Sequence, residues 1–160
     1  MLKILDDYEV NRSTMALLSV AHIDYCTIVV EENQVFYVRK TTTEIVKASC
    51  LEGGASYEGR RKAIRYRTGS KQKVPIAINP GENIYAFPTH SPKAFECNWI
   101  FFNHVKYIST IHLPNKETKS RILFKNGLHI DMNESRYILE KQMKRTAICI
   151  LWLSPQSVRF

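Results

Sequence analysis

The stretch RILFKNGLHIDM, residues 121–132, carries the clearest local folding signal in the chain. It places the pair Asn126–Gly127 between two runs of matching length, and Asn-Gly accepts the positive φ angles of a type I′ turn. The twist of that turn suits two antiparallel strands, and a two-residue turn puts Leu123 and Ile130 on the same face. The stretch therefore predicts a β-hairpin.

Short segments rich in β-branched and aromatic residues recur on the N-terminal side of this hairpin, with turn residues between them. Such segments are typical of strands. They cover residues 14–20, 26–30, 35–39, 74–78, 84–87, 99–105 and 107–113. Together with two helical segments, they predict an α+β fold built mostly on antiparallel sheet.

The two predicted helices lie near residues 43–52 and 134–150. Thr42 or Thr43 is able to cap the first helix, and Gly53–Gly54 ends it. Asn133 is a good N-cap for the second helix, which is amphipathic. Its apolar face holds Leu139, Met143, Ala147 and Ile150, and its basic face holds Lys141, Lys144 and Arg145. The second helix is expected to pack on the sheet with a basic stripe outward, although an ordinary surface helix shows the same pattern.

Length and composition limit the class of protein. A chain of 160 residues suits one domain, over residues 1–160, and its 44% hydrophobic residues argue against wholesale disorder. The N-terminus is not a secretory signal, and the apolar run at residues 147–153 is too short to span a bilayer. We therefore expect a cytoplasmic protein with no membrane contact.

The four cysteines are widely separated and contain no Cys-x-x-Cys pair. This spacing fits isolated thiols in a reducing compartment. A zinc site would need Cys97 with His90 or His104 and distant partners, so no metal and no cofactor is expected.

The net charge of +8 is concentrated in one segment. Residues 60–73 contain seven basic residues and no acid, which leaves 16 basic against 15 acidic residues elsewhere. The seven are Arg60, Arg61, Lys62, Arg65, Arg67, Lys71 and Lys73. Such a concentration indicates a surface for a polyanion, and a solvated basic loop is the plainer alternative.

Enzyme patterns fit less well. The segment Gly54–Arg61 superficially follows a nucleotide-binding P-loop, but arginines occupy the positions of the phosphate-binding Lys and the magnesium-binding Ser or Thr. Hydrolase nucleophile elbows are absent, and the five histidines are dispersed. We expect no catalysis. An RNA-binding or other polyanion-binding module is the main alternative to a DNA-binding protein, and a P-loop-like NTP-binding enzyme is the weaker one.

A series of short matches resembles one known family, the competence transcription factor ComK family. The matching positions are Tyr8–Asn11, Val35–Val38, Ile45–Val46, Ser49–Cys50, Gly54, Ser56–Tyr57, Gly59–Arg60, Pro75–Ile76, Phe87–Thr89, Ser91, Cys97, Trp99–Ile100, His104–Val105, Phe124, Asn126–Gly127, Glu140, Gln142 and Arg145–Thr146. Each match is short, and their order and spacing together are specific.

The resemblance implies a bacterial activator of DNA-uptake genes that binds A/T-rich boxes in double-stranded DNA through the minor groove. It also implies a dimer or tetramer on DNA at the nucleoid, with RNA polymerase as a further partner. Family members usually continue past the final helix into a segment held by a protease adaptor, whereas this chain stops at Phe160, which puts adaptor binding in doubt.

Arginine is well suited to phosphate contact and to a narrow minor groove, so the basic run supplies the first candidates for DNA contact. These are Arg60, Arg61, Lys62, Arg65 and Arg67, with Lys71 and Lys73 as backbone contacts and Lys141, Lys144 and Arg145 as a second patch.

Overall fold

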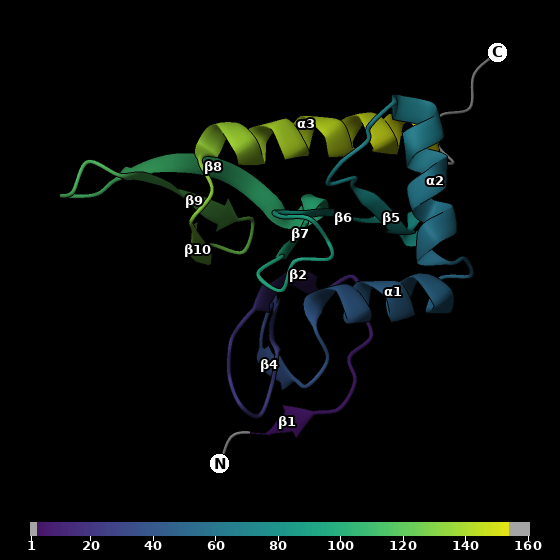
Figure 1. Ribbon diagram of the computed structural model, residues 1–160, viewed down its shortest axis with the longest axis horizontal. Coiled ribbons are helices and arrows are strands. Elements are labelled where there is room, and N and C mark those ends of the chain that lie inside the picture. Colours follow the sequence, from purple (N-terminus) through teal and green to yellow (C-terminus); the bar gives the residue numbers. More distant parts are fainter. Residues whose placement is uncertain (1–2, 154–160) are drawn as a thin grey trace.

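A computed structural model describes residues 3–153 of the chain (Figure 1). Residues 154–160, on which the expectation about adaptor binding rests, lie outside the described residues. Within residues 3–153 the chain forms ten strands and three α-helices, which confirms the α+β prediction.

The seven strands of the larger sheet are β1 (Ile4–Leu5), β2 (Thr14–Ser19), β3 (Thr27–Glu31), β4 (Val35–Val38), β5 (Ile76–Asn79), β6 (Ile84–Pro88) and β7 (Trp99–Phe101). Their order is β1-β4-β3-β2-β7-β6-β5. All neighbours are antiparallel except β1 and β4. The strand β1 was not predicted, because two residues are too few for a periodic pattern.

A smaller sheet contains β8 (Val105–His112), β9 (Thr118–Phe124) and β10 (His129–Met132) in the order β10-β9-β8. The helices are α1 (Thr42–Glu52), α2 (Tyr57–Thr68) and α3 (Arg136–Leu153), and short 3-10 turns cover η1 (Pro80–Glu82) and η2 (Phe102–His104). The strand predicted over residues 99–105 is therefore interrupted by η2. Its first part is β7 of the larger sheet, and its last residue begins β8 of the smaller sheet.

The larger sheet buries side chains on both faces. Trp99 and Phe101 of β7 join a cluster that contains the buried residues of α1, whereas Ile100 between them joins a cluster formed with β8, β9 and α3. Successive strand side chains point to opposite faces, so one strand serves both clusters. Figure 1 shows the consequence: α1 lies on one side of the sheet, and α3 lies along β8 on the other.

The hairpin of β9 and β10 is present, but its predicted register was wrong. Ile130 pairs with Ile122 and not with Leu123, and the Phe124 amide donates to the Leu128 carbonyl. The loop therefore has three residues and ends at Gly127 with φ +93°. This is the alternative in which a type I turn is followed by a left-handed residue, and it moves every pairing by one position.

Two helix starts also differ from the prediction. Thr41 caps α1 through a reciprocal capping box with Glu44, so the cap lies just before Thr42. In α3 the Ser135 hydroxyl accepts the Ile138 amide, and the helix begins at Arg136 and not after Asn133. The sequence offers several good caps in both places, and propensity alone does not choose between them.

Candidate nucleic-acid interface

Residues 60–68 of the basic run form most of the helix α2, which was not predicted from the sequence, and Lys71 and Lys73 follow the helix. The Ser56 hydroxyl accepts the Gly59 amide at its start, and Gly69 ends it at φ +73°. Only Tyr57 and Ile64, seven residues apart, are buried in this helix. Because only this narrow stripe contacts the core, most of the helix surface is exposed to solvent. Two apolar positions are too few for a periodic pattern that would predict a helix from the sequence.

Arg60 points inward. Its Nη2 atom donates to the Gly53 carbonyl at the end of α1, at 3.1 Å, and its Nε atom is buried. A cation is favourable there because the carbonyls at a helix C-terminus carry partial negative charge. Arg60 thus ties α2 to α1. The contact also shows how far this segment is from a P-loop, which follows a strand and not a helix.

Arg61 lies on the side of α2 that borders a groove of about 620 Å³. Two chain segments, 71–74 and 91–93, form its other walls together with α1. The basic residues that line it are Lys47, Arg61, Lys71, Lys73 and Lys93, and the one acid among its lining residues is Glu58. Lys47 and Lys93 were not found in the sequence analysis, since each is an isolated lysine far from the basic run.

Arg145 supports one wall of this groove, the segment 71–74. Its Nη2 atom donates to the Gln72 carbonyl at 2.7 Å and its Nη1 atom to the Lys73 carbonyl at 3.3 Å. The buried Gln142 donates to the same Lys73 carbonyl at 2.9 Å. Partial burial lowers the pKa of Arg145. Sequence patterning placed Arg145 on an outward face, whereas its guanidinium binds the main chain.

Lys62 and Arg65 are exposed and border a shallow depression of about 320 Å³ that also reaches Lys71. Lys71 lines the larger groove as well, so the two hollows meet at its side chain. Arg67 points elsewhere: its guanidinium lies 5.6 Å from the Trp152 ring centroid at the end of α3. The structure thus gathers Arg61, Lys62, Arg65, Lys71 and Lys73, and separates them from Arg60 and Arg67.

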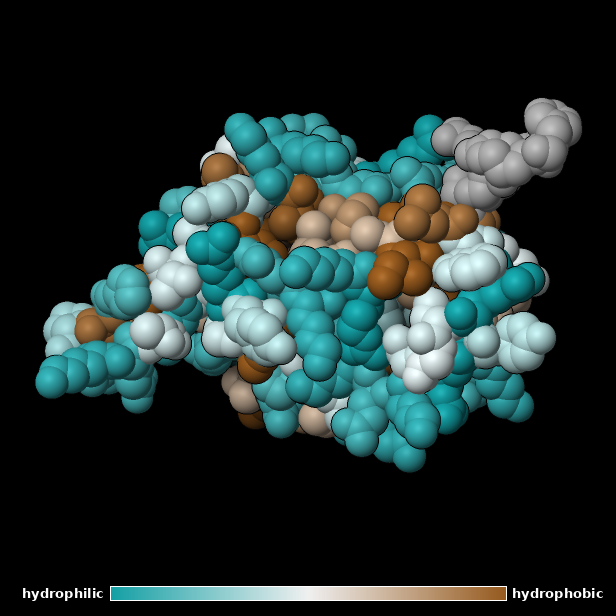
Figure 2. Space-filling view, turned by 90° about the horizontal axis from the view of Figure 1, so that it is seen from above, coloured by the Kyte–Doolittle hydropathy of each residue, from teal (hydrophilic) through white to brown (hydrophobic). Residues whose placement is uncertain are grey.

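The second predicted patch lies on α3, where Lys141 and Lys144 are exposed. They share the helix surface with exposed apolar side chains at Tyr137, Ile138, Ile148, Leu151 and Trp152. Figure 2, which looks down on α3, shows the apolar side chains as a band along this helix. The buried side is centred on Leu139, Gln142, Thr146 and Cys149, and two of these four are polar. The predicted basic stripe is therefore mixed with apolar surface.

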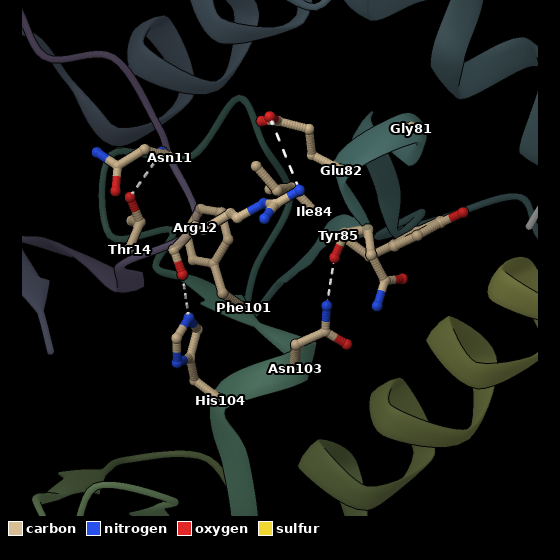
Figure 3. A pocket seen from close by; sticks show the side chains of 11 residues that line it. Asn11, Arg12, Thr14, Gly81, Glu82, Ile84, Tyr85, Phe101, Asn103 and His104 are labelled. Carbon is tan, nitrogen blue, oxygen red and sulfur yellow. Dashed lines mark hydrogen bonds and ion pairs between the residues drawn. The ribbon is translucent and has the colours of Figure 1, made fainter.

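Another hollow, of about 430 Å³, lies between the start of β2 and the turns around η1 and η2 (Figure 3). Its polar side chains engage one another: Arg12 lies 4.0 Å from Glu82, and His104 Nε2 hydrogen-bonds to the Arg12 carbonyl at 2.6 Å. Asn103 donates to the Asn83 carbonyl across the same hollow. With both signs of charge and these internal contacts, it does not suit a polyanion.

The thiols have no role in a site of this kind. Cys50, Cys97 and Cys149 are buried, and burial raises the pKa of each to about 11. Over residues 3–153, His, Cys, Asp and Glu nowhere form a group of three able to hold a metal ion. No helix in the same range is long and apolar enough to cross a membrane.

The fold and this surface define a class: an α+β protein whose surplus positive charge gathers on one helix and its adjoining groove, as expected for a protein that binds a polyanion. Comparison with known proteins gives the family. The ComK protein family matches residues 5–157. The competence transcription factor of Bacillus subtilis (strain 168) is 35% identical over 145 residues, which are 89% of this chain and 73% of that protein. This chain belongs to the ComK family, as its short motifs predicted. No solved structure matches it.

Membership of this family makes the chain a transcription activator of competence and not an enzyme. The short motifs that carried the resemblance are mostly core and cap positions: Trp99 and Ile100 are buried, and Ser56 caps α2. They identify the fold more directly than they identify contacts with a ligand.

Proposed function

We propose that this chain activates competence genes by binding A/T-rich boxes in double-stranded DNA through the exposed surface of α2. The observation that carries the proposal is the grouping of Lys62, Arg65 and Lys71 on one exposed surface. Five of the seven basic residues of the run 60–73 lie on α2, in which only Tyr57 and Ile64 are buried. A rigid helix that presents cations to solvent is suited to phosphate contact.

Minor-groove recognition follows from the chemistry of A/T-rich DNA. A-tracts have a narrow minor groove with enhanced negative potential, which attracts an inserted arginine. Arg65 is the exposed arginine of the shallow depression and is our choice for this contact. Lys62 and Lys71 then contact phosphates on either side.

We further propose that the chain acts in the cytoplasm, at the nucleoid, as a homo-oligomer. The exposed apolar side chains of α3, among them Ile148, Leu151 and Trp152, support a protein contact, because large apolar side chains grouped on a surface mark interaction sites. A symmetric dimer or pair of dimers fits spaced boxes on DNA. RNA polymerase is the other partner that an activator requires.

The test compares binding to an A/T-rich duplex, a G/C-rich duplex and a single-stranded RNA by fluorescence anisotropy over a range of salt. We expect the tightest binding to the A/T-rich duplex, with a slope of log K against log salt of about −3 to −4 per subunit. Equal affinity for the three nucleic acids, or affinity that does not change with salt, would contradict the proposal.

A variant pair locates the surface. Changing Lys62→Gln with Arg65→Gln is expected to weaken binding to the A/T-rich duplex by about tenfold or more and to reduce the preference over the G/C-rich duplex. The matched control is Lys116→Gln with Lys119→Gln, which removes the same charge near the β8–β9 connection. Equal losses in the two double variants would move the binding surface away from α2.

A further inference from the structure

The groove beside α2 brings five basic side chains to one hollow, with one carboxylate among its lining residues. On other surfaces some basic side chains pair with carboxylates, such as Arg39 with Asp6 at 2.9 Å and Arg121 with Asp131 at 2.7 Å. Among the lining cations of the groove, only Arg61 has such a pair within the described residues, and its distance to Glu58 is 3.9 Å. Lys47, Lys71, Lys73 and Lys93 form no ion pair with a carboxylate within residues 3–153, although the charge of Lys47 helps to lower the pKa of Glu44 one turn away on α1.

The walls that carry these lysines are held by side-chain hydrogen bonds. The Thr43 hydroxyl of α1 donates to the Pro92 carbonyl at 2.9 Å and also accepts the indole N–H of Trp99 at 3.3 Å. On the other wall, Arg145 and Gln142 hold the carbonyls of Gln72 and Lys73. Like charges repel one another, so a groove that keeps them together on a rigid frame is prepared for an anion.

The surfaces that line the groove suit phosphate better than a nucleobase. The buried Tyr57 already has the Lys47 ammonium 5.5 Å from the centroid of its ring. Val74 is also buried, which leaves Pro92 as the half-buried apolar side chain of the lining. A base needs an accessible aromatic or apolar face for stacking, whereas phosphate needs only cations and amides.

We propose that this groove binds the sugar–phosphate backbone of the DNA that α2 contacts, with Lys47 and Lys93 as phosphate ligands. The two hollows meet at Lys71, so a strand that leaves Lys62 and Arg65 passes directly into the groove. This inference rests on the proposed function. Backbone contacts fix the register of a protein on the duplex without reading sequence, so this site adds affinity and leaves base preference to α2.

The experiment changes Lys47→Gln with Lys93→Gln and measures binding to A/T-rich and G/C-rich duplexes from low to high salt. Loss of two phosphate contacts is expected to make the slope of log K against log salt less steep by about 1.8, since each contact contributes about 0.9. The slope should change equally for both duplexes, and the ratio of their affinities should stay the same. Lys47→Arg with Lys93→Arg should keep the original slope, and the Lys116→Gln, Lys119→Gln control should change it much less.

An unchanged slope in the Lys47→Gln, Lys93→Gln variant, with normal duplex binding by the parent chain, would overturn this inference and leave the proposed function standing. Failure of the parent chain to bind duplex DNA would overturn both. Tripolyphosphate serves as the probe for a free anion: we expect it to compete with the duplex. Binding of tripolyphosphate in the groove without competition would assign the groove to a small anion and overturn the inference.

Discussion

Arg60 and Arg145 show how a guanidinium in a basic protein serves the protein's own main chain. Arg60 donates to the Gly53 carbonyl at the end of α1, and Arg145 donates to the Gln72 and Lys73 carbonyls in the segment after α2. A planar group with five N–H donors binds several carbonyls at once, which an ammonium does less well. Arg60 adds to the charge of the basic run and Arg145 to the charge of α3, but both guanidiniums use hydrogen-bond donors on the protein's own main chain.

Replacing Arg145 by Met tests this role, because Met keeps much of the length of the side chain without its donors. We expect the free energy of unfolding to fall by about 1–3 kcal/mol, since the Gln72 carbonyl loses a charged donor and the Lys73 carbonyl keeps only Gln142. Urea denaturation measures the change. The control is Lys144→Met on the exposed side of the same helix, which should change stability by less than about 0.5 kcal/mol. Equal stability of the two variants would show that the Arg145 contacts contribute little.

At the scale of elements, α1 meets β5 at a contact that leaves no room for a side chain. A Cβ added to Gly53 would lie 2.7 Å from the Ile78 carbonyl oxygen. Gly53→Ala is therefore expected to destabilise the protein by about 1–3 kcal/mol, because backbone must shift on one side or the other.

Thermal or urea unfolding measures the Gly53 effect, and Gly81→Ala in η1 is its control. A Cβ at Gly81 would meet the Asn79 side chain at 3.5 Å, an ordinary contact, so we expect little change there. A Gly53→Ala variant as stable as the parent would mean that the end of α1 moves away from β5 without cost.

The elements that sequence predicted best are those with strong periodic or turn signals. The strands at residues 14–20 and 84–87 were found within one residue at each end, and the first helix within one residue of its observed start. The helix α2 was missed because only Tyr57 and Ile64 anchor it, so tertiary contacts and the caps Ser56 and Gly69 decide its form.

The sequence predicted which segment carries the charge of the candidate site, but it did not predict which side chains of that segment face solvent. The run 60–73 was correct as the location of the charge, yet nothing local distinguishes the inward Arg60 from the outward Lys62. Lys47 and Lys93 join the groove only because α1 and the segment 91–93 fold against each other. Such contacts join residues about fifty positions apart, and a local pattern carries no signal for them.

At the scale of the whole molecule, β7 links the clusters on both faces of the larger sheet, because Trp99 and Ile100 belong to different clusters. Loss of either cluster exposes the same strand. We therefore expect the chain to unfold in one cooperative transition, as a single domain over residues 1–160 should.

The buried thiols give this transition a pH dependence. Burial raises the pKa of Cys50, Cys97 and Cys149 from 9.0 to about 11. Between pH 9 and 11 the unfolded chain releases these protons while the folded chain keeps them, so stability is complete below pH 9 and falls as pH rises toward 11. Each thiol contributes at most about 1.4 kcal/mol per pH unit.

Urea midpoints measured from pH 8 to pH 11 check this expectation, and a Cys149→Ala variant should show a shallower decline than the parent. A midpoint that stays constant up to pH 11 would contradict it. Two separate transitions at any pH would contradict the single domain.

The contacts from α3 to the Lys73 carbonyl also have a consequence for the order in which the protein becomes functional during synthesis. Ribosomes synthesise a chain from its N-terminus at about 5–20 residues per second, so α2 and the segment with Lys71 and Lys73 emerge before Gln142 and Arg145. Until α3 has emerged and docked, the segment that carries Lys71 and Lys73 lacks the donors that hold its main chain in place. A nascent chain thus exposes its positive charge before the surface that we propose for DNA binding is held in place, and docking of α3 completes that surface.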